Sequence, residues 1–475
     1  MISFSIWDIV IILAFFLVVL IIGFLPEKKD TETAEGYLLS GRKVGLFLFI
    51  LTNVSTWYGG ILGVGEFTYR YGISSWFTQG LPYYIFAIVF ALFFAKKIRS
   101  ASLFTIPDKL RSTYGNKVAL SSAILLFILV SPAPYLLMIG SLINLIFKVN
   151  LFWSLVIATF LSAAYLLKGG YRSDLLTDAF EFFVMFAGFI VIMFAAYGSL
   201  GNFSYLSANL PPEHLSLSGG ASYTYILVWF LIALWTFTDP GFHQRCYAAK
   251  DGNVAVKGII ISVFFWALFD FLTTFTGLYS RAALPGLKTP VLSFPMLAEK
   301  LLGPGLKGLF YSAMFATILS TSNSFFFLSA TTFGRDFLYS RKKPGDERLL
   351  KRYTVAGLLV SGVISILMAY FIPSVIDLWY TIGTICIPGI IIPVISAYYP
   401  GLRINSAFAL AEIVLSCMIS LVWYVLRAEF AGVAVLSEVE PMIAGLLFAV
   451  FIHTSGLLFA RKARVLSKAQ ADNCQ

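Results

Sequence analysis

The chain has 475 residues, of which 59% are hydrophobic and only 12% are charged, and its mean hydropathy is +0.85. A soluble domain carries about 25% charged residues, so this composition excludes a soluble globular protein. The net charge of +10 does not indicate nucleic-acid binding, because the positive residues lie in short loops and no soluble domain carries a basic face. The composition predicts a membrane protein.

The sequence contains no pattern typical of an enzyme. Its four cysteines lie far apart without a CxxC spacing, and its three histidines are too few for a familiar catalytic metal centre. Walker-type phosphate loops, nucleophile elbows and HExxH motifs are all missing from it. We therefore expect neither an ATPase nor a hydrolase, and no enzymatic activity.

The first apolar run, at 7–25, predicts a transmembrane helix that is retained in the mature protein. No basic residue precedes this run, whereas Glu27, Lys28 and Lys29 follow it. A secretory signal would carry its basic residues first and a small-residue cleavage site afterwards. The same asymmetry predicts an N-terminus outside the membrane.

Runs of about 20 apolar residues recur along the chain, and each is long enough to cross a bilayer as a helix. The predicted spans are 5–25, 45–72, 74–95, 118–147, 150–167, 175–199, 223–243, 257–280, 308–334, 353–372, 375–399, 405–426 and 440–460. With the N-terminus outside, this number of spans places most of the 34 Lys and Arg residues on the inside, Lys342 and Lys343 among them. The C-terminus is then also inside, and the protein is expected in the cytoplasmic (inner) membrane.

Two of these spans are predicted to be interrupted. The span at 45–72 contains "LTNVSTWYGGILGVGEF", whose polar residues and glycines favour a break near 52–56. The span at 223–243 ends in "WTFTDPGFHQR", where Pro240 lacks the N–H that a helix needs. These spans open two successive groups of five. Odd-numbered groups with broken first helices are typical of inverted-repeat transporters, although glycines in membrane helices also serve close packing.

Four stretches of the sequence resemble the sodium/solute symporter family. They are "NVSTWYGGILGVGEFTYRYG" (53–72), "GGYRSDLLTDAFEFF" (169–183), "DPGFHQRCYAAKD" (239–251) and "TILSTSNS" (317–324). The resemblance implies an all-α polytopic membrane protein of 13 transmembrane helices with a leucine-transporter-like core. It divides the chain into a leading helix (5–25), a five-helix repeat (45–199), an inverted five-helix repeat (223–400), two trailing helices (401–460) and a cytoplasmic tail (461–475).

The resemblance also implies a Na+ site between the first and eighth core helices. Leu51, Val54 and Thr317 would contribute backbone carbonyls, and Ser320 and Thr321 would contribute hydroxyl oxygens. Oxygen ligands suit a hard cation, and an interrupted helix exposes carbonyl groups that an intact helix would use itself. The alternative is structural, because membrane Ser and Thr often bond to their own helix or join two helices.

A second Na+ site, found in some family members, would use Asp178, Asn323 and Ser324. Two residues depart from the family pattern: Asn323 replaces a serine, and Glu181 replaces a glutamine. The stoichiometry therefore stays open, and protons are an alternative coupling ion.

Four acidic residues lie deep in the predicted spans, namely Asp178, Glu181, Asp239 and Asp270. Acids within a membrane are costly and mark functional sites. The predicted spans contain no central Lys or Arg that could pair with these acids. We therefore expect cations, protons or water to satisfy the carboxylates. For Asp239, pairing with Arg245 or with a helix end is the alternative, and Asp270 has no assigned role.

Positions near the two breaks and in the tenth core helix suggest the solute contacts, which are Trp57, Tyr58, Trp235, Thr238 and Tyr380. Aromatic residues form 17% of the chain, so packing or a place in the interfacial belt is the alternative for each ring.

The sequence predicts Na+-coupled symport of a small organic solute by alternating access. A proton-coupled symporter is the nearest alternative, and an uncoupled channel or uniporter and a membrane sensor are others. The expected partners are Na+, the solute and lipid, with the monomer as the functional unit.

Overall fold

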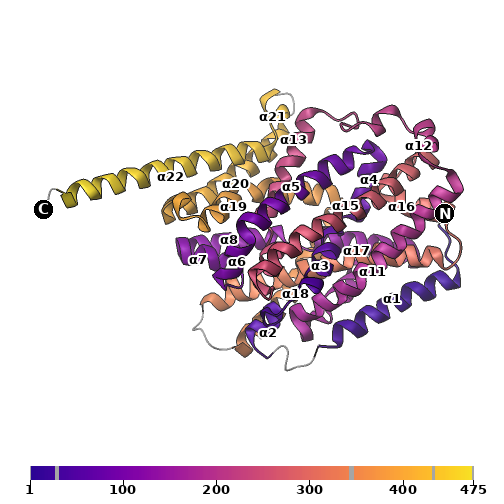
Figure 1. Ribbon diagram of the computed structural model, residues 1–475, viewed down its shortest axis with the longest axis horizontal. Coiled ribbons are helices and arrows are strands. Elements are labelled where there is room, and N and C mark those ends of the chain that lie inside the picture. The colour runs from indigo at the N-terminus through magenta and orange to yellow at the C-terminus, as the bar shows by residue number, and fades with distance from the viewer. Residues whose placement is uncertain (1, 27–31, 342–346, 431–433, 473–475) are drawn as a thin grey trace.

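The computed structural model describes residues 2–26, 32–341, 347–430 and 434–472, and over these ranges the fold is helical (Figure 1). The α-helices are α1 (Ile6–Phe24), α2 (Ala34–Leu39), α3 (Leu46–Ser55), α4 (Ile61–Tyr71), α5 (Leu81–Phe90), α6 (Lys96–Ala101), α7 (Ile106–Tyr114), α8 (Asn116–Leu129), α9 (Ala133–Phe147), α10 (Leu151–Ala163), α11 (Leu166–Leu200), α12 (Phe203–Asn209), α13 (Tyr223–Ile232), α14 (Pro240–Ala248), α15 (Gly252–Ala283), α16 (Ser293–Leu301), α17 (Leu306–Thr331), α18 (Glu347–Phe371), α19 (Val375–Ala397), α20 (Ser406–Glu429), α21 (Ala434–Glu438) and α22 (Pro441–Asp472).

Shorter helical turns join or extend these helices. Those with 3-10 geometry are η2 (Ser40–Arg42), η3 (Thr56–Tyr58), η6 (Pro212–Leu215), η7 (Ala233–Phe237), η8 (Pro290–Leu292), η10 (Tyr339–Arg341) and η11 (Pro400–Leu402), and those with π geometry are η4 (Trp76–Gly80), η5 (Ala91–Ala95) and η9 (Thr332–Leu338).

Within the described residues, 11 helical segments are long and apolar enough to cross a membrane, and one bent pair brings the number to 12. The 13 spans expected from the sequence therefore exceed the number that length and composition support. The difference is the span predicted at 150–167, which corresponds to α10. This helix has 13 residues and is about 20 Å long, shorter than the roughly 30 Å hydrocarbon core. The predicted inside residues Lys28, Lys29, Lys342 and Lys343 lie outside the described residues.

The bent pair is the first interrupted span. Helix α3 continues through η3 to Tyr58, and α4 begins at Ile61 with its axis turned by 56°. The sequence predicted an interruption here but placed it at 52–56. The α-helix does end at Ser55, within that range, but the chain continues through the 3-10 turn η3 and bends only at Gly59 and Gly60.

The second predicted interruption is confirmed. Helix α13 tightens into η7, and a new helix, α14, starts at Pro240 with Asp239 as its N-cap. The Asp239 carboxylate accepts a hydrogen bond of 2.6 Å from the N–H of Gly241, as a helix N-cap does. Of the two alternatives raised for Asp239, the structure shows the helix end.

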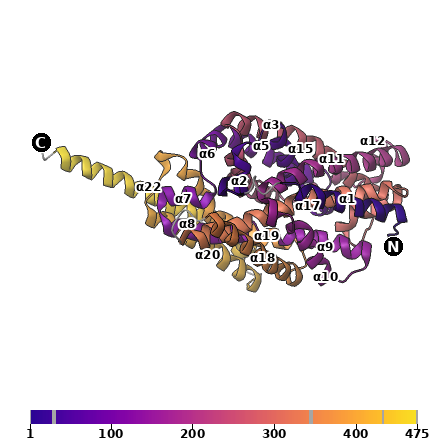
Figure 2. The same cartoon turned by 90° about the horizontal axis from the view of Figure 1, so that it is seen from below.

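Helices α11 and α17 pack along each other at the centre of the fold, with α1 against both and α3 against α11 and α15. Helix α17 is almost entirely buried, whereas large apolar side chains such as Phe194 and Phe264 project from the outer faces of other spans, as expected for contact with lipid. Helices α20 and α22 pack against each other and α19. The C-terminal part of α22 extends beyond the bundle, and the two termini lie at opposite ends of the molecule (Figures 1 and 2).

Candidate cation site

The polar stretch of α17 meets the end of α3 at Thr321. The Thr321 hydroxyl donates a hydrogen bond of 2.6 Å to the backbone carbonyl of Thr56, and it lies 3.4 Å from the carbonyl oxygen of Thr317. Gly59 permits this approach, because a Cβ at Gly59 would overlap the Thr321 side chain. The interruption in the first bent span is therefore held directly against α17.

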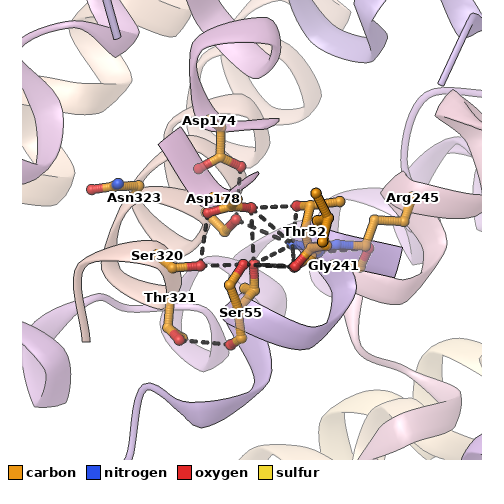
Figure 3. A network of polar contacts seen from close by, with 12 residues as sticks. Thr52, Ser55, Asp174, Asp178, Gly241, Arg245, Ser320, Thr321 and Asn323 are labelled. Carbon is orange, nitrogen blue, oxygen red and sulfur yellow. Dashed lines mark hydrogen bonds and ion pairs between the residues drawn. The ribbon is translucent and has the colours of Figure 1, made fainter. Parts of the chain in front are cut away.

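Ser320, the neighbouring residue, connects α17 to a carboxylate of α11. Its hydroxyl donates a hydrogen bond of 2.7 Å to Asp178 Oδ1 and lies 3.3 Å from the Thr56 hydroxyl (Figure 3). The other carboxylate oxygen, Oδ2, accepts hydrogen bonds from the hydroxyls of Thr52 and Thr56. The sequence assigned Asp178 and Ser320 to two different sites, and the structure joins them by a hydrogen bond.

The three predicted carbonyl ligands have different partners. The Leu51 carbonyl accepts a hydrogen bond of 3.0 Å from the Ser55 hydroxyl, and the Val54 carbonyl, in the last turn of α3, accepts one from the Thr56 N–H. The Thr317 carbonyl faces Thr321, as described above. Neutral carbonyl and hydroxyl oxygens beside one buried carboxylate are coordinating atoms that suit a hard monovalent cation.

The structure shows a basic partner for Asp178, namely Arg245, which the sequence analysis raised only as a partner for Asp239. Arg245 is only 3% exposed, and its guanidinium lies 3.8 Å from the Asp178 carboxylate. Its Nη2 also donates to the hydroxyls of Thr52, Thr56 and Ser324, and Nη1 donates to a backbone carbonyl of its own helix. The expectation that no Lys or Arg lies among the deep acids is therefore wrong. The predicted span ended at 243, whereas α14 continues to Ala248 and carries Arg245 inside.

The residues predicted for a second Na+ site are less closely grouped. The Ser324 hydroxyl donates a hydrogen bond of 2.7 Å to Asp174, a residue that the sequence analysis did not consider. Asn323 bonds the Tyr165 hydroxyl through its amide nitrogen, and Figure 3 shows it turned away from Asp178. Asp174 precedes Asp178 by four residues, which places both on one face of α11, and this spacing was a signal available in the sequence.

Several polar atoms near this second group have no hydrogen-bond partner within the described part of the chain. They are both carboxylate oxygens of Glu181, Oδ1 of Asp174 and Oδ1 of Asn323, and all three side chains are 0% exposed. Buried polar atoms are rarely left unpaired. Three acids, Asp174, Asp178 and Glu181, share one face of α11, and the guanidinium of Arg245 lies beside Asp178.

A cavity of about 240 Å³ adjoins the site and lies between the two interrupted spans. Thr321, Ser324 and Arg245 line it on the side of the polar network. Among the predicted solute contacts, Trp57, Tyr58 and Trp235 line the cavity. Thr238 and Tyr380 do not belong to its lining: Thr238 bonds the Trp235 carbonyl, and Tyr380 bonds Glu440.

The profile of the family described as "Sodium:solute symporter family" matches residues 37–415 of the sequence. The chain belongs to this family. It is therefore a multi-pass membrane transporter, and Na+ is its coupling ion. The match includes both interrupted spans and the polar stretches of α11 and α17, so the resemblance found from the four short motifs is confirmed.

Comparisons with individual proteins agree with this assignment. The sodium/proline symporter of Staphylococcus aureus strain JH9 is 23% identical over 480 residues, covering 94% of this chain and 91% of the relative. A Na+-coupled sialic acid symporter, solved in a substrate-bound outward-open state, superposes with a TM-score of 0.81 at 14% identity over 97% of this chain and 98% of the other. A nucleobase-cation-symport-1 family transporter, with bound bromovinylhydantoin, gives a TM-score of 0.56 at 14% identity, over 90% and 95% of the two chains. The chain thus shares its fold with these two transporters.

Proposed function

We propose that this symporter carries a small organic solute in the cavity between its interrupted helices and draws on Na+ bound where α3 meets α17. The observation that carries the proposal is the hydrogen bond from Thr321 to the Thr56 carbonyl at the bend of the first interrupted span. An ion that ligates α3 and α17 together would fix the angle between them, and this angle shapes one wall of the cavity.

The proposed Na+ ligands are the carbonyl oxygens of Leu51, Val54 and Thr317 and the hydroxyl oxygens of Ser320 and Thr321. Coordination would use lone pairs of these hydroxyl oxygens, so both hydroxyls could keep the hydrogen bonds that they donate to Asp178 and Thr56. Since the ligands are neutral, the ion can leave without stranding a charge in the membrane. The nearby Asp178 carboxylate favours the cation, and its ion pair with Arg245 limits that attraction.

Proton coupling is a second candidate, and the unpartnered Glu181 carboxylate favours it. This carboxylate could bind a second cation or a proton, and the polar residues Asp178, Asn323 and Ser324 would belong to the same second site. Radioactive Na+ binding to the purified protein separates these cases. Two ions per protein, falling to one in Glu181→Gln, would support a second Na+. One ion per protein, with uptake that responds to an imposed pH gradient, would support the proton.

We further propose the family arrangement of 13 spans, with α10 as a short crossing and two inverted repeats at 45–199 and 223–400. The two termini lie at opposite ends of the molecule, which supports opposite sides of the membrane for them (Figure 1). We propose that the N-terminus is outside and the C-terminus inside. Labelling of single cysteines placed near Ser3 and Lys462 with a membrane-impermeant reagent in intact cells tests the orientation. Reaction at the first position alone is the expected result.

The coupling proposal is tested by equilibrium binding of radioactive Na+ in competition with unlabelled Na+ and K+. We expect saturable binding that unlabelled Na+ displaces and K+ does not. The Ser320→Ala/Thr321→Ala double variant should lose one ion per protein. Unchanged Na+ binding by a folded double variant would show that both hydroxyls have only a structural role.

A further inference from the structure

Asp270 of α15 is an acid in the wall of the cavity for which neither the cation site nor the family comparison provides a role. It is 8% exposed, and its exposed part faces the cavity. The Tyr84 hydroxyl donates a hydrogen bond to Oδ2 of this carboxylate. Within the residues that the structure describes, no Lys, Arg or His forms an ion pair with Asp270. A carboxylate in the core of a membrane protein is costly unless something positive approaches it.

The charged lining of the cavity is predominantly negative. In the described part of the chain, its charged members are Asp239, Arg245 and Asp270. The guanidinium of Arg245 is already engaged with Asp178 and with hydroxyls of α3. The carboxylate of Asp239 caps α14 and is 7% exposed. The unbalanced charge of the cavity is therefore negative.

The cavity that Asp270 faces is rich in aromatic side chains. Trp57, Tyr58, Trp76 and Trp235 are among the rings that line it. The face of an aromatic ring attracts a cation, with a strength of about 2 kcal/mol or more where water is excluded. A carboxylate among such rings is a typical recognition site for an organic ammonium ion.

The local backbone brings Asp270 close to one of these rings. Trp76 and Gly80 begin and end the π-helical turn η4, a type of turn that often occurs at functional sites. A Cβ at Gly80 would lie 2.7 Å from Asp270 Oδ2, 3.0 Å from the Trp76 ring and 3.1 Å from the Tyr84 hydroxyl. The absence of a side chain at Gly80 therefore lets the carboxylate, the indole and the phenol meet in one small volume, with Thr274 one turn further along α15.

We infer that the cavity binds a small organic solute with a protonated or quaternary ammonium group, and that Asp270 receives this group with Trp76 beside it. The inference rests on the proposed function, because it assigns a class of solute to the same cavity. A volume of about 240 Å³ admits a compact ammonium compound. A solute whose only charge is negative would meet the unpaired carboxylate and be repelled.

The test measures binding to the purified protein by calorimetry, in Na+ and in K+, with two matched pairs of probes. Choline is compared with 3,3-dimethylbutanol, its neutral carbon isostere, and cyclohexylammonium is compared with cyclohexanol. We expect each ammonium ion to bind about tenfold or more tightly than its neutral partner when Na+ is present. Asp270→Asn should abolish the difference, and Trp76→Leu should reduce it. The control Glu213→Gln, which neutralises an exposed acid outside the spans, should preserve it.

Each other outcome is decisive. Equal binding of charged and neutral probes, failure of both ammonium ions to bind, or an unchanged preference in Asp270→Asn would overturn the inference. If Asp270→Asn does not elute as a single species, Gly80→Ala replaces it, because its methyl group would crowd the carboxylate. Na+-dependent binding of the neutral probes alone would leave the proposed function standing without the ammonium site. An ammonium preference that is the same in K+ would keep the ammonium site and contradict Na+ coupling.

Discussion

Arg245 of α14 and Asp178 of α11 form a buried ion pair, 3.8 Å apart, between the cation site and the cavity. The guanidinium also bonds hydroxyls of α3 and α17, so one side chain joins elements from both interrupted spans to α11 and α17. Movement of α14 relative to α3 must disturb the hydrogen bonds from the guanidinium to Thr52 and Thr56. Arg245 is therefore positioned to couple the state of the cation site to the shape of the cavity.

Removal of the guanidinium should destabilise the protein strongly. Arg245→Gln leaves the Asp178 charge buried without its partner, and we expect a loss of about 3–5 kcal/mol in the free energy of unfolding. The double variant Arg245→Gln/Asp178→Asn should recover part of that loss, and a double-mutant cycle of thermal unfolding measures the coupling. The control Arg70→Gln breaks an exposed ion pair with Glu66 and should cost about 1 kcal/mol or less. Additive effects of the two buried substitutions would contradict the account.

Na+ should stabilise the folded protein through Ser320 and Thr321. Any ligand that binds only the folded state raises the unfolding temperature, and the stabilisation grows with the logarithm of its free concentration relative to its Kd. We expect the unfolding temperature of the wild type to rise when Na+ replaces K+, and this rise to disappear in Ser320→Ala/Thr321→Ala. The control is Ser312→Ala, which removes a buried hydroxyl of the same helix that bonds only its own backbone. An equal response of the double variant and the control would refute the assignment.

A methyl group at Gly59 should separate α17 from the bend in the first interrupted span. Because a Cβ there overlaps Thr321, Gly59→Ala must push the helices apart, at a cost of about 1–3 kcal/mol. The response to Na+ should weaken together with the stability. Gly198→Ala adds the same methyl group on α11, where nothing lies within 4 Å, and serves as the control. Thermal unfolding in Na+ and in K+ gives both quantities, and a Gly59→Ala protein that behaves like the control would count against the contact.

Acid should weaken the fold through His214, which lies outside the spans in η6. Its ring nitrogen Nε2 bonds the Tyr69 carbonyl at 3.0 Å, and burial lowers the pKa of the imidazole below its usual 6.5. The unfolded chain takes up a proton near pH 6.5, whereas the folded protein does so only at lower pH. The free energy of unfolding should therefore fall as the pH drops through about 6.5. Unfolding temperatures between about pH 5 and 8 should show a shallower decline in His214→Gln, and an identical decline would show that another group is responsible.

Much of the fold could be predicted from composition and spacing. Apolar runs of membrane-crossing length recur along the sequence, and Pro240 marks the interruption before α14 because it supplies no helical N–H. The bend at Gly59 and Gly60 was placed too early, since local propensity favoured a break at polar residues that tertiary contacts hold in a helix.

The network around the cation site could be predicted only in part. Ser320, Thr321 and Asp178 were found from their motifs, but Arg245 was considered only as a partner of Asp239, because the predicted span ended at 243. Asp174 was missed although it shares a helix face with Asp178. The packing of α11 against α17 decides which carboxylate accepts a hydrogen bond from which hydroxyl. No local pattern in the sequence encodes that register.

The central claim is that Na+ bound between α3 and α17 drives solute uptake. Its most direct test is uptake into proteoliposomes of a panel of labelled amino acids, sugars, carboxylates and amines, with a Na+, K+ or proton gradient imposed. The account predicts that an inward Na+ gradient drives accumulation of at least one solute and that a K+ gradient does not. It also predicts that the Ser320→Ala/Thr321→Ala variant requires more Na+ for half-maximal uptake, whereas Ser312→Ala requires the same amount as the wild type. Accumulation of the preferred solute that is the same with and without Na+ would contradict it.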